Sequence, residues 1–302
     1  MNRRRFLGGS SVAAASAALG VGLDALFSLA RSADCAAAPP GVQLYTVRDA
    51  LVRDLRGTLA SLEKIGIVEA ELYGFGDGDR VLGVPPAQLR RLFDAHGIRL
   101  PFAHVDDAPE LTPTIADIAH GLGVSTVVVA LPREFMRAGR MVAPATRMQL
   151  DNLAERLNGL ARDYRARGLG FAYHNHWMEF VETDGVLPYE YLIAKTDPGR
   201  VGLELDVGWA AFAGVDAADL IRRHGRRILA CHLKDFDPAI AADANERKLV
   251  PPGDGMVDFR AVFGAMSDAK VAHGFIEIDT ADDPLAAVAR GERHLQTLPA
   301  CS

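Results

Sequence analysis

Phe171-Ala172-Tyr173-His174-Asn175-His176-Trp177-Met178-Glu179-Phe180 begins as an apolar run and becomes polar within a few residues. The apolar part follows Gly168-Leu169-Gly170 and predicts a buried strand. If that strand continues, His174 and His176 lie on one face, because side chains alternate along a strand. Two imidazoles and the Glu179 carboxylate so close together can form a metal or proton-transfer site. A pair of structural buried histidines explains this decapeptide equally well.

Length and composition limit the possible domain organisation and the classes of partner and site. The chain could form two small domains or one large one, and α/β barrels commonly take about 250 residues. Hydrophobic residues make up 49% of the 302 residues, enough for a substantial core, and the formal charge of -6 argues against nucleic acid as a partner. Cys35, Cys231 and Cys301 have no framework spacing, so a disulfide scaffold or a CxxC metal site is not expected.

The first 38 residues have the three parts of an export signal. A basic head at residues 2–8 is followed by an apolar run from Ser10 to about Ala30 and by Ala36-Ala37-Ala38 before Pro39. Arg3-Arg4-x-Phe6-Leu7 resembles the core of a twin-arginine signal. The resemblance implies export of the folded protein by the twin-arginine machinery, to the periplasm or beyond.

Two other interpretations of this segment fit less well. Gly20, Gly22 and Asp24 interrupt the apolar run, which argues against an uncleaved membrane anchor. Cys35 leaves a lipoprotein open, although Asp34 before it is a poor match. We therefore expect a signal peptide at 1–38 and one folded domain at 39–302.

From Gly41 onward, short apolar strands alternate with helical segments. Strands are predicted at 41–45, 67–72, 99–104, 126–130, the opening stretch, 201–206, 227–233 and 272–278. Helices are predicted at 49–65, 86–96, 114–121, 143–168 and 284–298. This alternation indicates a single-domain (β/α)8 TIM barrel. A doubly wound open sheet is the alternative, but no strand is followed by a GxGxxG turn. The long connection 235–258 is expected to cover the active site.

Ionisable and polar residues recur where the predicted strands end. They are Gln43, Tyr45, Arg48, Glu71, His104, His174, His176, Asp206, His232, Lys234, Asp235 and Glu277. Catalytic groups of such barrels lie at this end, and buried ionisable groups are costly unless they are paired or bind metal. The common position of these residues therefore predicts one site.

Asp206, His232 and Glu277 contribute two carboxylates and an imidazole from three consecutive strands. With water in the remaining positions, this set suits one divalent ion such as Mn²⁺, Mg²⁺, Co²⁺ or Zn²⁺. Such an ion polarises a carbonyl or enediolate oxygen, and nearby His or Glu side chains can then move a proton at carbon.

Five short motifs in this order resemble the sugar phosphate isomerase/epimerase superfamily of xylose isomerase-like barrels. They are Tyr173-His174-Asn175-His176 with Glu179-Phe180, Leu203-Glu204-Leu205-Asp206-Val207-Gly208-Trp209, His232-Leu233-Lys234-Asp235, Gly253-Asp254-Gly255 before Asp258-Phe259, and Phe275-Ile276-Glu277. The resemblance implies one divalent ion held at the ends of strands five to eight by a Glu, an Asp, a His and a second Glu.

Three of these four ligands carry over, to Asp206, His232 and Glu277. The Glu of strand five does not, and His174 is its best replacement, with His176 and Glu179 as rivals. In epimerases of the superfamily the two Glu residues also form the acid–base pair, so the loss of the first argues against simple two-base epimerisation.

Two further features bear on the substrate. Trp209 stands where many epimerases of the superfamily have a substrate-binding His. The Tyr-His-Asn-His version is typical of exported relatives, some of which resemble enzymes that act on 3-keto sugars and eliminate a glycosidic bond. Trp177 or Trp209 could stack on a sugar or simply pack the barrel.

Three hypotheses follow. The first is a metal-dependent isomerase or epimerase of a non-phosphorylated sugar, the second a lyase or hydratase of a keto sugar or keto-glycoside, and the third a non-catalytic sugar-binding barrel. A homo-oligomer is compatible with each of them, and the acidic charge disfavours the endonuclease branch. The candidate acid–base and orienting residues are Glu277, His176, Glu179, Lys234 and His104.

Overall fold

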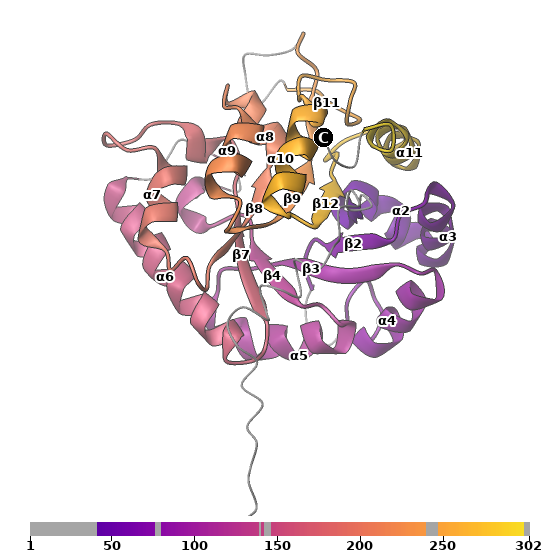
Figure 1. Ribbon diagram of the computed structural model, residues 1–302. Helices are drawn as coiled ribbons and strands as arrows, with labels where there is room; N and C mark the ends of the chain where they lie inside the picture. Colours follow the sequence, from indigo (N-terminus) through magenta and orange to yellow (C-terminus); the bar gives the residue numbers. More distant parts are fainter. Residues whose placement is uncertain (1–40, 76–79, 139, 142–145, 240–246, 299–302) are drawn as a thin grey trace, which may run out of the picture.

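The computed structural model describes residues 41–75, 80–138, 140–141, 146–239 and 247–298 (Figure 1). Within these ranges, parallel strands close into a barrel in the order β1-β12-β9-β8-β7-β4-β3-β2. Their bounds are β1 Gly41–Gln43, β2 Glu69–Leu72, β3 Arg99–Val105, β4 Thr126–Val129, β7 Gly170–His174, β8 Gly202–Asp206, β9 Ile228–Leu233 and β12 His273–Ile276. The predicted (β/α)8 barrel is confirmed.

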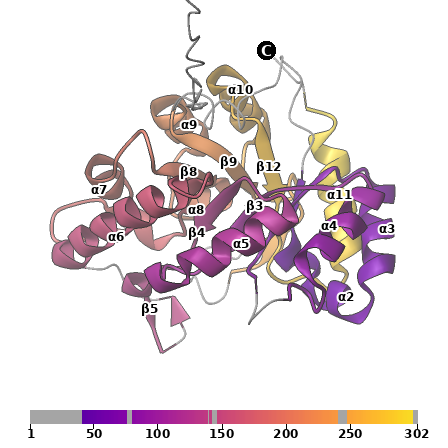
Figure 2. The same ribbon diagram turned by 90° about the horizontal axis from the view of Figure 1, so that it is seen from below.

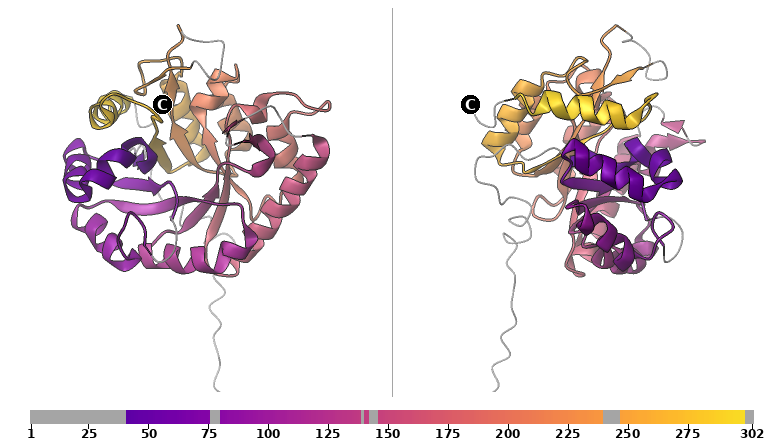
Figure 3. Two further views of the ribbon diagram at one scale, coloured as in Figure 1. Left: turned by 180° about the vertical axis from the view of Figure 1, so that it is seen from behind. Right: turned by 90° about the vertical axis from the view of Figure 1, so that its right-hand side faces the viewer.

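Helices surround the barrel on its outer side (Figures 1 and 2). They are α2 Arg48–Arg53, α3 Leu55–Ile65, α4 Pro86–Ala95, α5 Thr112–Leu122, α6 Arg147–Arg165, α7 Pro188–Lys195, α8 Val207–Phe212, α9 Ala217–His224, α10 Phe259–Ala269 and α11 Pro284–Leu295. The last helix, α11, lies beside α3, so the helical ring closes together with the sheet (Figures 1 and 3). No helix among these ranges is long and apolar enough to span a bilayer.

The core has two layers, because each barrel strand is covered on both faces. The larger cluster lies between the sheet and the helices. A smaller apolar cluster, made of strand residues, consists of Phe102, Val128, Ala172, Leu229, Ala230 and Phe275. Alternate residues of a strand point into the barrel. The residues two positions after Phe102, Ala172, Ala230 and Phe275 therefore also face the barrel axis.

Three predicted elements end elsewhere than expected, each because of one polar side chain. The first strand stops at Gln43, whose side chain accepts the Tyr45 N–H and caps the short helix Leu44–Val47. The helix predicted at 49–65 is divided at Asp54, which accepts the Gly57 N–H and starts α3. The opening strand does not continue to His176; it ends at His174.

The end of β7 has a clear physical cause. Asn175 turns its side chain across to β8, where its Oδ1 accepts the Asp206 N–H at 3.1 Å. Its Nδ2 donates to the Asp206 carbonyl at 3.4 Å. Side-chain amide bonds thus replace the next step of backbone pairing between β7 and β8, and the expectation that His174 and His176 share a strand face is wrong.

The other differences are at helix ends. The helix predicted at 143–168 is α6, which begins at Arg147 because Thr146, its N-cap, forms a capping box with Gln149 in the first turn. The connection 235–258 contains the short antiparallel pair β10 Asp235–Phe236 and β11 Leu249–Val250. The predicted signal peptide at 1–38 lies outside the described residues.

Candidate metal centre and active site

A layer of polar side chains lies directly above the small apolar cluster. His104, His174, His232 and Glu277 each come two residues after an apolar member of it, namely Phe102, Ala172, Ala230 and Phe275. The strands run in parallel, so this step brings all four side chains to the carboxyl end of the barrel. The periodicity of the strands therefore explains why residues far apart in sequence meet here.

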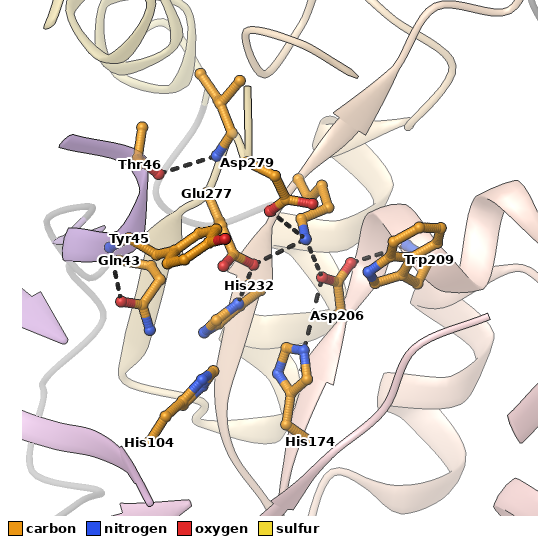
Figure 4. A network of polar contacts seen from close by, with 12 residues as sticks. Gln43, Tyr45, Thr46, His104, His174, Asp206, Trp209, His232, Glu277 and Asp279 are labelled. Atoms are coloured by element: carbon orange, nitrogen blue, oxygen red, sulfur yellow. Dashed lines mark hydrogen bonds and ion pairs between the residues drawn. The ribbon is translucent and has the colours of Figure 1, made fainter. Parts of the chain in front are cut away.

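Four side chains at this end form a compact set of donor atoms, which we call the outer set. His174, Asp206, His232 and Glu277 each offer one ligand atom, all within 4.8 Å of one another. Figure 4 shows these side chains turned toward one another. All four are buried, and Asp206 Oδ2 accepts no hydrogen bond. Two imidazoles, two carboxylates and an unsatisfied carboxylate oxygen fit a divalent ion.

The distances between neighbouring atoms of the outer set differ. His232 Nδ1 lies 2.7 Å from Glu277 Oε2, and His174 Nε2 lies 3.9 Å from Asp206 Oδ2. Asp206 also caps α8, because its Oδ1 accepts the Trp209 N–H at 2.8 Å. One oxygen of Asp206 is thus fixed by the helix, and the other is left for the site.

Lys234 balances the negative charge of this region. Its Nζ lies 2.9 Å from Glu277 Oε2, 3.4 Å from Asp206 Oδ2 and 3.1 Å from Asp279 Oδ1. Burial alone would lower the pKa of Lys234, but Asp279, Glu277 and Asp206 raise it above its ordinary value. Lys234 therefore stays protonated.

The ionisation of the outer set follows from burial and from its neighbours. Burial lowers the pKa of His174 to about 3, with His232 adding to this effect and Glu204 opposing it. Burial also raises the pKa of Asp206 to about 6, against the opposing charge of Lys234. His174 is consequently neutral near pH 7, the form that binds metal.

A second set of polar groups, which are buried except for the half-buried His104, lies on the other side of the two histidines. Glu204 Oε2 lies 3.0 Å from His174 Nδ1 and 3.2 Å from His232 Nε2. Glu71 Oε2 lies 2.6 Å from His232 Nε2. His104 belongs to this inner set, because its Nε2 lies 2.9 Å from Glu204 Oε2.

Sequence reasoning did not assign Glu204 or Asp279 to the site. Glu204 comes two residues before Asp206 in the same strand, so strand alternation was a usable signal for it. Asp279 lies beyond the end of β12, in a connection without periodicity, and its contact with Lys234 depends on the path of that connection.

His176 and Glu179 lie beside the outer set. The rings of His174 and His176 are 5.0 Å apart, and His176 Nδ1 is buried with no hydrogen-bond partner. Burial, with His174 adding, lowers the pKa of His176 well below its ordinary value. Glu179 accepts hydrogen bonds from the Tyr173 hydroxyl and, at 2.9 Å, from the His176 backbone N–H. Glu179 thus holds the segment that carries His176.

Trp209 is part of the packing. It is fully buried, with Phe212 and Phe236 at ring distances of 5.6 and 4.9 Å. Asp235 anchors the long connection, because its carboxylate accepts the N–H groups of Gly253, Gly255 and Val257 at 2.9–3.0 Å. A buried carboxylate therefore holds part of the loop that the sequence places over the active site.

Several known proteins are similar to this chain. Residues 64–298 match the family model described as xylose isomerase-like TIM barrel. An inosose dehydratase from Geobacillus thermodenitrificans is 29% identical over 189 residues, which are 57% of this chain and 62% of that protein. The chain thus matches less than two thirds of the length of this curated relative.

Solved structures share the fold. A sugar phosphate isomerase/epimerase from Parabacteroides distasonis has a TM-score of 0.72 at 22% identity, over 90% of this chain and 100% of that one. The IOLI protein, solved with a zinc atom bound, has a TM-score of 0.63 at 17% identity, over 85% of this chain and 96% of that one. Since the family model matches almost the whole barrel, this chain belongs to the xylose isomerase-like TIM barrel family.

Proposed function

We propose that the protein is a divalent-metal-dependent isomerase or epimerase that removes a proton next to the carbonyl of a non-phosphorylated sugar or sugar derivative. The observation that carries this proposal is the outer set: two imidazoles and two carboxylates within 4.8 Å, with an oxygen of Asp206 that accepts no hydrogen bond. The zinc bound to the IOLI protein supports a divalent ion in this fold.

The outer set supplies the ligands. His174, Asp206, His232 and Glu277 would hold the ion, which as a Lewis acid lowers the cost of negative charge on a substrate carbonyl oxygen. His232 carries a proton in the ion-free protein: burial opposes this, but Glu204, Glu277 and Glu71 raise its pKa well above the ordinary value. Ion binding must displace that proton and should strengthen as pH rises.

His176 is the best placed general base among the predicted catalytic residues. Its Nδ1 has no hydrogen-bond partner, and burial lowers its pKa well below the ordinary value, so the ring is neutral and has a nitrogen free to accept a proton. Glu277, the other candidate base, is already engaged by His232 and Lys234. Lys234 is a fixed cation that can hold a substrate oxygen, while Glu179 keeps the His176 segment in place.

A lyase or hydratase that acts on keto sugars or keto-glycosides is the second candidate. It shares the first step, removal of a proton next to the keto group, and differs because a β-oxygen then leaves as water or as an alcohol. Two observations favour it: the 29% identity to an inosose dehydratase, and His174 in the place of one acid–base Glu.

Metal content tests the site itself. We expect the protein purified without chelator to hold about one divalent ion per chain, and both His174→Ala and Asp206→Ala to lose it. His273→Ala is the matched control, since His273 is a buried histidine that contacts Glu69 Oε2 at 2.7 Å, away from this cluster. Elemental analysis measures the ion, and circular dichroism checks that each variant is folded.

The outcomes separate the hypotheses. An ion retained in His174→Ala would remove that residue from the ligands and favour a base role for it. An ion-free protein that also resists reconstitution would contradict the metal-dependent reaction and leave a sugar-binding barrel. With the ion established, a screen of ketoses and keto-glycosides distinguishes isomerisation from elimination by the mass of the product, because only elimination releases water or an alcohol.

A further inference from the structure

Glu204 lies among three imidazoles at the base of the candidate metal centre. It is fully buried in β8. Its Oε2 lies 2.9 Å from His104 Nε2 and 3.0 Å from His174 Nδ1. The same oxygen lies 3.2 Å from His232 Nε2. One carboxylate oxygen therefore meets ring nitrogens from three strands, β3, β7 and β9.

Two of these rings also face the outer carboxylates with their second nitrogen. His174 turns Nε2 toward Asp206 Oδ2, and His232 turns Nδ1 toward Glu277 Oε2. Each ring thus stands between an inner and an outer carboxylate. A neutral imidazole has one N–H and one lone pair, and only the lone pair binds metal. The nitrogen that donates its proton inward decides which lone pair faces outward.

We propose that Glu204 is a positioning residue that keeps the proton of His174 on Nδ1 when the ion is bound, beside Glu71, which holds that of His232 on Nε2. His174 Nε2 and His232 Nδ1 are then the lone pairs that face Asp206 and Glu277. This inference rests on the proposed metal site. A carboxylate behind a metal-binding imidazole fixes its tautomer and orientation and makes it a better ligand.

Neighbouring groups support the same arrangement. Glu71 Oε2 lies 2.6 Å from His232 Nε2, so a second carboxylate holds the inward proton of that ring. Gln43 Nε2 in turn donates to Glu71 Oε2 at 2.9 Å. The contacts His104–Glu204, His174–Glu204 and His232–Glu71 are hydrogen bonds of 2.6–3.0 Å, whereas His232 Nε2 approaches Glu204 Oε2 at 3.2 Å as an ion pair.

The decisive variant is Glu204→Gln in the full chain. A glutamine is neutral, so its oxygen accepts more weakly than the carboxylate, and wherever its NH₂ faces a ring instead it donates and favours the opposite tautomer of that ring. Glu69→Gln is the matched control, because Glu69 is also buried in a barrel strand and pairs with His273 and Arg99, both at 2.7 Å, outside the site.

Titration of the metal-free proteins with Co²⁺, followed by absorption, measures stoichiometry and affinity together. We expect wild type and Glu69→Gln to bind one Co²⁺ per chain with the same Kd. Glu204→Gln should bind one Co²⁺ with a Kd about 10–100-fold higher, the usual cost of losing such a partner. Its Co²⁺ absorption bands should also shift, since the ligand rings are no longer held in one orientation.

The tautomers can also be measured directly in the wild-type protein, so this test does not depend on whether a variant folds. Long-range ¹⁵N–¹H spectra of the Zn²⁺-loaded protein, labelled at histidine, identify the protonated nitrogen of each ring. We expect Nδ1–H for His174 and Nε2–H for His232, and the opposite tautomers would overturn the inference.

The outcomes of the titration distinguish failure of the positioning role of Glu204 from failure of the proposed metal site. An unchanged Kd in Glu204→Gln would overturn the positioning role and leave the metal site intact. Two ions per wild-type chain, with one lost in Glu204→Gln, would show that the inner donors themselves hold an ion. A wild type that binds no Co²⁺ or Zn²⁺ would contradict the proposed metal site and, with it, this inference.

Discussion

Lys234 shows how a single residue keeps a cluster of carboxylates compatible with burial. It is 2% exposed and has three acidic partners, Asp206, Glu277 and Asp279. Several buried anions without a cation would repel one another and lose their hydration. A divalent ion at the outer set would supply positive charge to two of the same carboxylates, so Lys234 and the ion would both offset the negative charge of Asp206 and Glu277.

Lys234→Met should therefore destabilise the metal-free protein by about 3–5 kcal/mol, the usual cost of removing one partner from a buried ionic group. Excess Mn²⁺ should reduce that deficit, because the ion replaces part of the lost charge and binds only the folded state. Urea unfolding with and without Mn²⁺ measures both effects. Lys195→Met is the control: Lys195 forms an exposed pair with Asp151, and its loss should cost at most about 1 kcal/mol. Equal midpoints for the two variants would contradict this account.

At the scale of elements, the turn from β8 into α8 connects the fold to the site. Asp206 ends β8 and caps α8 through its Oδ1. Gly208, in the first turn of α8, packs against the backbone of Lys234, the residue that follows β9. A Cβ at position 208 would lie 2.6 Å from the Lys234 carbonyl oxygen and 2.8 Å from its carbonyl carbon. The close approach of α8 to β9 therefore requires glycine here.

Gly208→Ala should push α8 away from β9 and move Asp206 with it. We expect a loss of stability of about 1–3 kcal/mol, typical of overpacking, together with a weaker affinity for Co²⁺. Gly264→Ala in α10 is the matched control, because no atom lies within 4 Å of its added Cβ. That variant should gain up to about 1 kcal/mol from helix propensity and keep its affinity. Equal stabilities of the two variants, measured by urea unfolding, would refute the argument.

At the scale of the whole molecule, the barrel begins just after the predicted signal. Gly41 pairs with Phe275 in β12, and Val42 pairs with Ala70 in β2, so the first strand is held on both sides. Among the described residues, the barrel closes with β1 between β12 and β2. Export as a folded protein and a sugar substrate outside the cytoplasm remain proposals.

Replacing both Arg3 and Arg4 by Lys tests the export proposal. If the twin-arginine machinery reads this pair, the double variant should remain in the cytoplasm while the wild type reaches the periplasm or the medium. Arg5→Lys, the neighbouring arginine outside the pair, is the control and should be exported like the wild type. Cell fractionation followed by immunoblotting measures the distribution. Export of the double variant at the wild-type level would exclude this route.

The sequence by itself determined the barrel and much of its polar end. Strand and helix periods are local properties, and parallel strands bring their carboxyl ends together, so the sequence alone predicts Asp206, His232 and Glu277 as neighbours. Only the tertiary structure decided which nitrogen of each histidine faces which carboxylate, that Glu204 lies among three rings, and that Asn175 ends β7 before His176. These contacts depend on barrel closure and on the register between strands, and neither is encoded in the pattern of any single segment.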